Sequence, residues 1–489
     1  MKNYPSSGFR PGAVITVLLS LALTLSMTAC FGTPQVDTPD ETESHEVVTL
    51  PPLTIPDPTD DRTFTDPTAY AERLDTLFAD SAPIPASELT YQITEKDEVT
   101  VTGYTGGEII LVIPDTIEDK PVTAIGVGAF AGMGNLKAVS IPDSVTSIGV
   151  GAFKDCHSLS SLRTPVYTCA DAPYFGALFG AASYETNGSF VPVSLTTLDL
   201  TQGETIPDYA FYACRGLEVV SLPETLNGIG NFAFYGCESL AYIPADGTAL
   251  TTVGERAFAG CHTLLSLTLP STVQTMGMGM LEGCGKLESL TLPFVGGCTY
   301  DYPLTEEEKE ALEKGDAIHP AEATGYLGYL FGASAHTFTA GYLPVSLMTV
   351  TVLEGCESIP ANAFFGCVSI REIRLPEGVI QIGRRAFYGC ERLTEMTLPD
   401  SVTAVGDDAF NGCSRMKTFT GGAGLSELGV QTFMNCVSLV AVTLPDAVES
   451  LPNSCFSGCL SLETLTAEGV TSQGKQVFRH CDKLQGWSN

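Results

Sequence analysis

One short motif recurs along the chain at a nearly constant interval. Apart from two interruptions, Phe-x-x-Cys returns every 22 to 24 residues. Its phenylalanines are Phe153, Phe211, Phe234, Phe258, Phe364, Phe387, Phe410, Phe433, Phe456 and Phe478. Each unit also has a short alternating stretch that ends in Leu-Pro, and a second apolar stretch that ends in glycine. One such unit cannot bury its apolar side chains alone, whereas stacked units can, so the sequence predicts a solenoid.

The detailed form of the unit identifies a family resemblance. The best-formed unit contains Ala386, Phe387, Cys390, Leu393, Met396, Leu398, Pro399, Val405 and Gly406. Its Cys-x-x-Leu, Leu-Pro-(Asp/Glu)-x-Val, Ile-Gly and Ala-Phe-x-x-Cys elements closely resemble BspA-type leucine-rich repeats of bacterial surface proteins. The resemblance covers about residues 90–487. It implies an α/β-type repeat solenoid, a leucine-rich repeat array of about 23-residue coils with short parallel strands. It also implies an N-terminal cap and first coil over residues 86–125, and the solenoid itself over residues 126–489.

Two lateral insertions interrupt the repeat near residues 165–194 and 294–346. Both contain Leu-Phe-Gly-Ala, at residues 178–181 and 330–333, and both return to a strand through Pro-Val-Ser-Leu. Insertions in solenoids map to one face, which is often the binding face. The alternative is that the insertions pack over the core and adjust its curvature, and the sequence leaves both interpretations open.

The amino terminus has the organisation of an export signal. Lys2 and Arg10 precede an apolar run from Ala13 to Leu25, and small residues precede Cys30. This arrangement resembles a bacterial lipoprotein signal, which implies removal of residues 1–29 and lipidation of Cys30. The alternative, an uncleaved transmembrane anchor, would need about 20 apolar residues. We therefore expect an extracytoplasmic, surface-exposed protein that contacts the cell membrane through its lipid anchor only.

The segment that follows, residues 30–85, is predicted to be a tether. Residues 31–85 contain twelve acidic and two basic side chains together with many prolines and threonines. Such a composition cannot bury a core and favours an extended, solvated chain. The chain as a whole has a net charge of -33, which argues against nucleic acid as a partner.

The cysteines are interpreted mainly as packing residues. Eleven of the 16 cysteines occupy the last position of the repeated motif, where stacking places them in one buried column. Four others, Cys169, Cys298, Cys356 and Cys455, leave disulfide formation open. Of these, Cys169 and Cys298 lie in the insertions and are the candidates for pairing or reaction. No catalytic residue, cofactor site or metal site is expected, because no nucleophile motif or paired Cys-x-x-Cys motif occurs.

The side of the strands that points away from the core is the candidate binding face. Solenoids usually bind partners through this extended surface. The residues chosen for it are Arg371, Glu372, Arg374, Thr397, Thr420 and Thr443. The family resemblance implies non-catalytic binding or adhesion to an extracellular protein or glycan. The alternative is a substrate-capture lipoprotein that serves a polysaccharide or peptide uptake system.

Overall fold

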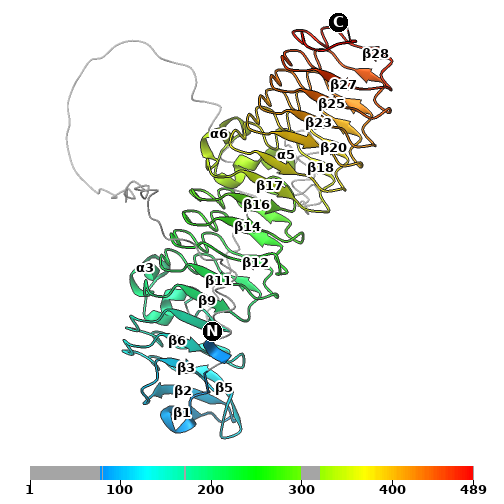
Figure 1. Cartoon of the computed structure of the whole chain (residues 1–489). Helices are drawn as coiled ribbons and strands as arrows, with labels where there is room; N and C mark the ends of the chain where they lie inside the picture. Colours follow the sequence, from blue (N-terminus) through cyan, green and yellow to red (C-terminus); the bar gives the residue numbers. More distant parts are fainter. Residues whose placement is uncertain (1–76, 80, 170–171, 299–319, 488–489) are drawn as a thin grey trace, which may run out of the picture. The chain divides into compact units, whose positions relative to one another are not determined.

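The protein was analysed as a computed structural model, which describes residues 77–79, 81–169, 172–298 and 320–487. Cys30, the predicted signal segment and most of the predicted tether lie outside these residues. From about residue 110 onward the chain winds into stacked coils, and each regular coil contributes two short strands (Figure 1). A search of the described residues found no helix with the length and apolar character needed to cross a membrane.

The longer strands of successive coils lie side by side and form the first strand column. Neighbouring strands are parallel and in register, so that Glu395 pairs with Thr418 and Ala441 pairs with Thr464, each one coil of 23 residues further on. The column contains β3 (Ile110–Val112), β6 (Ala138–Ser140), β8 (Ser161–Thr164), β9 (Thr197–Leu200), β11 (Val219–Ser221), β14 (Ser266–Thr268), β16 (Ser289–Leu292), β17 (Thr349–Val352), β19 (Glu372–Arg374), β21 (Glu395–Thr397), β23 (Thr418–Thr420), β25 (Ala441–Thr443) and β27 (Thr464–Thr466). This arrangement confirms the predicted fold class.

The shorter strands form a second column, and glycine follows most of them, whereas Pro207, Pro360 and Pro452 follow the others. Its strands are β5 (Lys120–Ile125), β7 (Ser147–Ile148), β10 (Thr205–Ile206), β12 (Gly228–Ile229), β13 (Thr252–Val253), β15 (Thr275–Met276), β18 (Ser358–Ile359), β20 (Gln381–Ile382), β22 (Ala404–Val405), β24 (Glu427–Leu428), β26 (Ser450–Leu451) and β28 (Ser472–Gln473). A Cβ atom on Gly406 would lie 2.6 Å from the backbone nitrogen of Arg384 in the preceding coil. The glycine is therefore required because two coils approach too closely for a side chain.

Phenylalanine and cysteine side chains fill the core between the columns. From Phe364 to Phe478 the rings stack nearly parallel, with centroids 4.9 to 5.8 Å apart. Most repeat cysteines also donate a hydrogen bond from Sγ to the carbonyl oxygen of the phenylalanine one coil earlier. Cys390 donates to Phe364 and Cys413 to Phe387, both at 3.2 Å. The cysteine column therefore links neighbouring coils as well as filling space.

A small antiparallel element covers the N-terminal end of the array. The 3-10 helix η1 (Ala86–Glu88) leads into β1 (Leu89–Ile93), which pairs antiparallel with β2 (Val99–Tyr104). Strand β2 in turn pairs parallel with β5, and β4 (Thr116–Ile117) pairs antiparallel with β5. At the opposite end of the described chain, Trp487 packs on Phe478 with centroids 5.5 Å apart.

The last part of the predicted tether is packed on the solenoid. Phe78 and Ile84 are each only 6% exposed, and the backbone N–H of Ile84 donates to the carbonyl oxygen of Val112 at 2.9 Å. Phe78 lies against Ala138 of the first strand column. The packed chain therefore begins before residue 85, because the apolar side chains of Phe78 and Ile84 are buried against the solenoid.

Candidate ligand-binding surface

The predicted binding residues lie together on the outer side of the first strand column. In β19, β21, β23 and β25 the middle side chain is buried and the two flanking side chains point outward, and in β27 the middle side chain is half-buried. From β19 to β27 these flanking side chains are exposed, except for Ala441, which is half-buried. Thr397, Thr420 and Thr443 occupy the same register position on consecutive strands. The structure thus brings the threonines into one row, extended by Thr466.

Charged side chains occupy the equivalent positions at β19. Arg374 and Glu372 flank the buried Ile373, and Arg374 Nε lies 2.7 Å from Glu372 Oε1. Both side chains are at least half exposed, so solvent screens this ion pair and it contributes little to stability. Arg371 precedes the strand and is also exposed. The predicted charged residues are therefore available to a ligand from solvent.

The same face is partly covered at its N-terminal end. There Arg163 on β8 forms an ion pair with Asp199 on β9, with Nε and Oδ2 2.6 Å apart. The guanidinium carbon of Arg163 also lies 5.3 Å from the centroid of the Phe78 ring. From β6 to β17 the outward positions of the strands are buried or half-buried, whereas from β19 to β27 all but Ala441 are exposed. The open part of the described face therefore lies from β19 to β27.

Each insertion replaces one of the backbone hydrogen-bonded contacts between successive coils, which we call rungs. In a regular coil, the N–H of Phe387 donates to the carbonyl oxygen of Ala409 in the next coil at 2.8 Å. At the first insertion, Phe153 donates instead to Leu178 of the 3-10 helix η2 (Phe175–Phe179) at 2.9 Å. At the second insertion, Leu281 donates to Leu330 of η4 (Leu327–Phe331) at 2.8 Å.

The insertions also interrupt the second strand column while leaving the first intact. Strand β8 pairs with β9 across the first insertion, and β16 pairs with β17 across the second. Within the described residues, the second column breaks after β7 and after β15, where the insertions begin, and also between β24 and β26. Both elaborations therefore replace the second strand, and the first strand column continues past them.

Short helices follow the 3-10 helix η2 and lie on either side of η4 in the sequence, and exposed apolar side chains lie in or beside them. The first insertion continues through η3 (Tyr184–Thr186) and α3 (Asn187–Phe190). The second contains α5 (Pro320–Thr324), η5 (His336–Phe338) and α6 (Thr339–Tyr342). Figure 1 shows α3 and α6 on the same flank of the array. Phe190 of α3 and Tyr342 of α6 are 42% and 47% exposed, and Val193 and Val345, just after these helices, are 75% and 84% exposed. The insertions thus contribute to the core and also present surface.

An aromatic cluster follows each insertion, and sequence reasoning missed both. After the first, the Tyr184 and Tyr209 rings stack at 4.3 Å, and Tyr209 stacks on Phe232 at 5.1 Å. After the second, His336 meets Phe365 at 5.0 Å, and Phe365 stacks on Tyr388 at 4.9 Å. The sequence does contain one signal for these clusters, which is an aromatic residue directly after the repeat phenylalanine. It occurs at Tyr212, Tyr235, Phe365 and Tyr388, only in the coils that follow the insertions.

The turn before the repeat phenylalanine has a left-handed backbone. The φ angles are +60° at Tyr209, +55° at Phe232 and +55° at Arg385, a conformation that bulky residues rarely adopt. Gly128 and Gly151 occupy the same turn position in earlier coils, with φ of +63° and +67°. The Gly-x-Gly sequences at 126–128 and 149–151 are therefore explained by backbone geometry.

The cysteines of the described chain are buried. Cys169 and Cys298, the residues considered for pairing or reaction, are buried thiols. Burial raises the pKa of Cys169 to about 11, so little reactive thiolate forms at neutral pH. Cys356 and Cys455 are also free and buried, and burial raises the pKa of both. By contrast, Cys481 accepts a hydrogen bond from Cys459, which lowers the pKa of its thiol.

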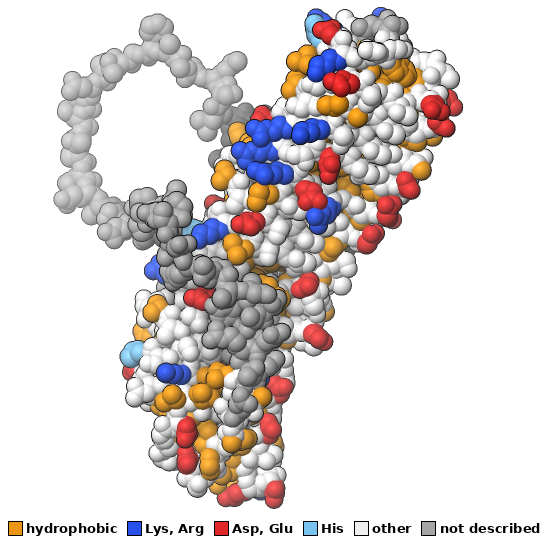
Figure 2. All heavy atoms as spheres, in the orientation of Figure 1, with side chains coloured by type: hydrophobic (Ala, Val, Ile, Leu, Met, Phe, Trp, Pro, Cys, Tyr) orange, Lys and Arg blue, Asp and Glu red, His pale blue; other side chains and the backbone are white. Residues whose placement is uncertain are grey.

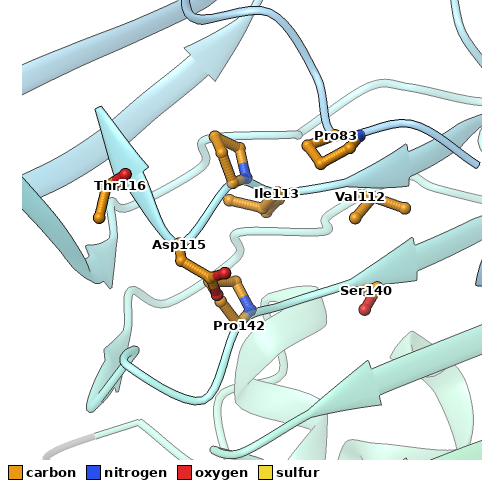
Figure 3. Close-up of a pocket in the computed structure, with 8 residues that line it drawn as sticks. Pro83, Val112, Ile113, Asp115, Thr116, Ser140 and Pro142 are labelled. Atoms are coloured by element: carbon orange, nitrogen blue, oxygen red, sulfur yellow. The ribbon is translucent and has the colours of Figure 1, made fainter. Parts of the chain in front are cut away.

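A shallow cavity of about 340 Å³ lies near the N-terminal end, between the first two coils. Figure 3 shows Pro83, Asp115 and Pro142 around it, with Asp115 as its single carboxylate. Hard cations need six or more oxygen ligands, so one carboxylate among prolines does not make a cation site. Across the described residues, no group of three or more histidine, cysteine or acidic side chains is placed to hold a metal ion.

Comparison with known families assigns the repeat. The model of the BspA type leucine-rich repeat region matches residues 113–171, 186–297 and 346–485, in six copies. These segments make up more than half of the chain. The chain belongs to the BspA-type leucine-rich repeat family. A search of the curated proteins gave no match.

Solved structures of leucine-rich repeat proteins are similar to this BspA-type chain. A leucine-rich repeat protein from Bacteroides ovatus is 22% identical, with 83% of this chain and 81% of that chain covered and a TM-score of 0.30. A leucine rich cell surface protein from Faecalibacterium prausnitzii is also 22% identical, with 80% and 97% covered and a TM-score of 0.29. The pneumococcal vaccine antigen PcpA is 18% identical, with 81% and 88% covered and a TM-score of 0.26.

Proposed function

We propose that this protein is a cell-surface lipoprotein whose leucine-rich repeat solenoid binds or adheres to an extracellular protein or glycan without catalysis. The observation that carries the proposal is the open face from β19 to β27. There exposed threonine and charged side chains are presented at one register position after another. An extended, repeating surface of this kind suits a partner that is itself extended.

The backbone holds this face in a fixed geometry. Strands β21, β23, β25 and β27 form one hydrogen-bonded parallel sheet, and β19 pairs with β17. The middle residues Ile373, Met396 and Phe419 are at most 7% exposed. The outward side chains are therefore presented with little loss of backbone freedom when a ligand binds. Such pre-organisation favours affinity because less conformational entropy is lost on association.

Surface presentation in this proposal rests on the sequence around Cys30. A lipid on Cys30 would hold the chain at the membrane, and the acidic segment after it would separate the solenoid from the lipid surface. We expect wild-type protein in the producing bacterium to incorporate a fatty-acid label, and the Cys30→Ala variant to incorporate none. Labelling of that variant would contradict the anchor.

Binding is tested with the soluble chain that begins at residue 31, applied to immobilised matrix proteins, mucin and glycans. We expect at least one ligand to be retained. A triple variant, Thr397→Glu, Thr420→Glu and Thr443→Glu, should lose it, because three charges enter the row of hydroxyls. The control places the same charges on exposed positions of the second column, through Gln381→Glu, Ser450→Glu and Ser472→Glu.

The outcomes separate the possible functions. Silence across all ligands, or catalytic turnover of any of them, would reject the proposal. Equal loss of binding in both triple variants would move the site away from the first strand column. Retention of free oligosaccharides or peptides, without any immobilised ligand, would favour the substrate-capture alternative.

A further inference from the structure

A group of cations stands out on the described surface of this acidic protein. The sequence has 24 Lys and Arg against 57 Asp and Glu. Five of these cations lie on or beside β19, β21 and β23, and we name them the basic cluster: Arg371, Arg374, Arg392, Arg415 and Lys417. All five are exposed. Figure 2 shows blue side chains gathered on the part of the array nearer the C-terminal end.

Backbone hydrogen bonds place the members on consecutive coils. The N–H of Thr394 donates to the carbonyl oxygen of Arg371 at 3.3 Å, and the N–H of Lys417 donates to that of Thr394 at 2.8 Å. The N–H of Arg415 donates to the carbonyl oxygen of Glu391, the residue before Arg392, at 3.2 Å. Adjacent strands lie about 4.8 Å apart, so the five charges span about 10 Å along the array.

Most of this charge is not neutralised within the protein. Among the described residues, only Arg374 of the basic cluster forms an ion pair, with Glu372. Elsewhere, Arg256 pairs with Glu255 and Glu282, and Arg385 pairs with Asp408. The carboxylates within three residues of a cluster member in sequence are Glu372, Glu377, Glu391 and Glu395, so the five cations still outnumber the four neighbouring anions in a chain whose net charge is -33.

The groups around the cluster suit sulfate and carboxylate on a sugar chain. Guanidinium groups bind both anions through two parallel N–H donors, and lysine adds a point charge. Exposed hydroxyls of Thr394, Thr397, Thr418 and Thr420 lie on the same coils and can hydrogen-bond to sugar hydroxyls. Duplex DNA carries one charge per about 1.7 Å, and the surrounding carboxylates would repel so dense a polyanion. A polysaccharide with one or two charges per sugar is better matched.

We propose that the basic cluster and these threonines bind an anionic polysaccharide that carries sulfate or carboxylate groups. This inference rests on the proposed binding function and names the ligand class. The polymer lies along the first strand column and crosses the coils of β19, β21 and β23. Arg371, Arg392, Arg415 and Lys417 contact its anionic groups, while the threonine hydroxyls contact the neutral part of the sugars.

The experiment measures the affinity of the soluble chain beginning at residue 31 for chondroitin sulfate, hyaluronan and dextran. Chondroitin sulfate carries sulfate and carboxylate, hyaluronan carries carboxylate only, and dextran is neutral. The test variant is Arg392→Gln, Arg415→Gln and Lys417→Gln. The matched control is Lys137→Gln, Lys286→Gln and Lys475→Gln, three exposed cations outside the cluster. Melting temperatures of both variants confirm that they remain folded.

We expect the test variant to bind chondroitin sulfate roughly tenfold more weakly than wild type, and the control to bind within about twofold. Binding should also disappear near 1 M salt, where the Debye length is about 3 Å. Hyaluronan bound as tightly as chondroitin sulfate would identify carboxylate as sufficient. Much weaker hyaluronan binding would identify sulfate as the required group.

Several results would overturn the inference. These are equal affinity of wild type and the test variant, equal binding of dextran, and equally tight binding of duplex DNA. If neutral glycans or proteins are still retained on the strand face in those cases, the proposed function stands and only the ligand class is wrong. If no ligand of any kind is retained, the proposed function fails as well.

Discussion

The two insertions are separated by 152 residues in sequence and are built on the same plan. Gly176 and Gly328 occupy matching positions, and Gly180 and Gly332 end the two 3-10 helices with φ of +91° and +90°. Both helices supply the backbone rung that links the coil before them to the coil after them. The backbone scheme is therefore shared, although the surrounding side chains have diverged.

The difference lies in how each insertion is fixed to the next coils. In the first, Asn187 is fully buried, accepts a hydrogen bond from Gly176 N–H and donates one to Ala210 O. In the second, Thr339 takes this position and donates to His336 O. Tyr184 of the first insertion is replaced by His336 in the second. The comparison shows that a shared backbone tolerates different side-chain contacts, which predicts unequal responses to matched substitutions.

The largest expected effect is common to both insertions. A Cβ atom on Gly176 would lie 2.9 Å from Ala181 Cβ and 3.0 Å from Asn187 Cα, and one on Gly328 would lie 3.0 Å from Thr339 Cα. Gly176→Ala and Gly328→Ala should each destabilise their insertion by about 3 kcal/mol, the upper range for overpacking. Hydrogen exchange of peptides from each insertion measures the loss separately, because solenoids can open locally.

A glycine in open space provides the control for these two variants. No atom lies within 4 Å of a Cβ built on Gly341, in α6. Gly341→Ala should therefore leave exchange unchanged or slow it, since alanine favours a helix by about 0.5 to 1 kcal/mol. Equal destabilisation by Gly341→Ala and Gly328→Ala would show that the close approach is not the cause.

The next effect should distinguish the insertions. Asn187→Ala leaves the buried N–H of Gly176 without its partner and removes one of the two hydrogen bonds that Ala210 O accepts, which should cost about 2 kcal/mol. Thr339→Ala removes one hydrogen bond to a half-buried residue and should cost about 1 kcal/mol. The measurement is again local hydrogen exchange, in which a loss of about 2 kcal/mol corresponds to a roughly 30-fold faster exchange rate. Equal costs would mean that the two side chains hold their insertions equally firmly.

Aromatic contacts give a smaller difference. Tyr184 stacks on Tyr209 at 4.3 Å and meets Tyr212 edge-on at 5.6 Å, whereas His336 has edge contacts with Phe365 and Tyr326. Tyr184→Ala should destabilise the first insertion by about 1 kcal/mol, the scale of such pairs. Tyr184→Phe keeps the ring and should change local exchange little. A large loss in the phenylalanine variant would assign the effect to the hydroxyl.

The repeat was readable from the sequence because its signals recur at a fixed interval. Strand positions, buried phenylalanines and the outward row of Thr397 and Thr420 all follow from alternation within a 23-residue coil. The cysteine contact was less visible, because Cys390 bonds to Phe364, 26 residues earlier in the preceding coil.

Contacts at the insertions could not be predicted in the same way. The Leu-Phe-Gly-Ala element is recognisable, but its rung depends on the hydrogen bonds of Phe153 and Phe175 to residues 25 and 35 positions away. The aromatic cluster of Tyr184 likewise depends on Tyr209, in another coil. These partners vary between the two copies, so no periodic signal marks them. Sequence reasoning predicted the two insertions and left their attachment undetermined.

The smallest expected effect depends on pH and should occur in the second insertion only. Burial, together with the nearby Arg385, lowers the pKa of His336 below its ordinary value of about 6.5. Above about pH 6.5 the imidazole is neutral in both the closed and the opened insertion, and its contribution to stability is complete. As the pH falls below that value, the opened state binds the proton more readily, so the insertion loses stability until the folded-state pKa is passed.

Hydrogen exchange of η5 and α6, corrected for intrinsic rates, should therefore show more opening at pH 5.5 than at pH 7.5. The first insertion serves as an internal reference, because Tyr184 stands at the matching position and does not titrate in this range. His336→Tyr introduces that residue into the second insertion and should abolish the pH dependence. Equal pH responses in both insertions, or an unchanged response in His336→Tyr, would assign the effect to other groups. If His336→Tyr alone loses the pH dependence, the different pH response of the two insertions, whose backbones match, is caused by this one side chain.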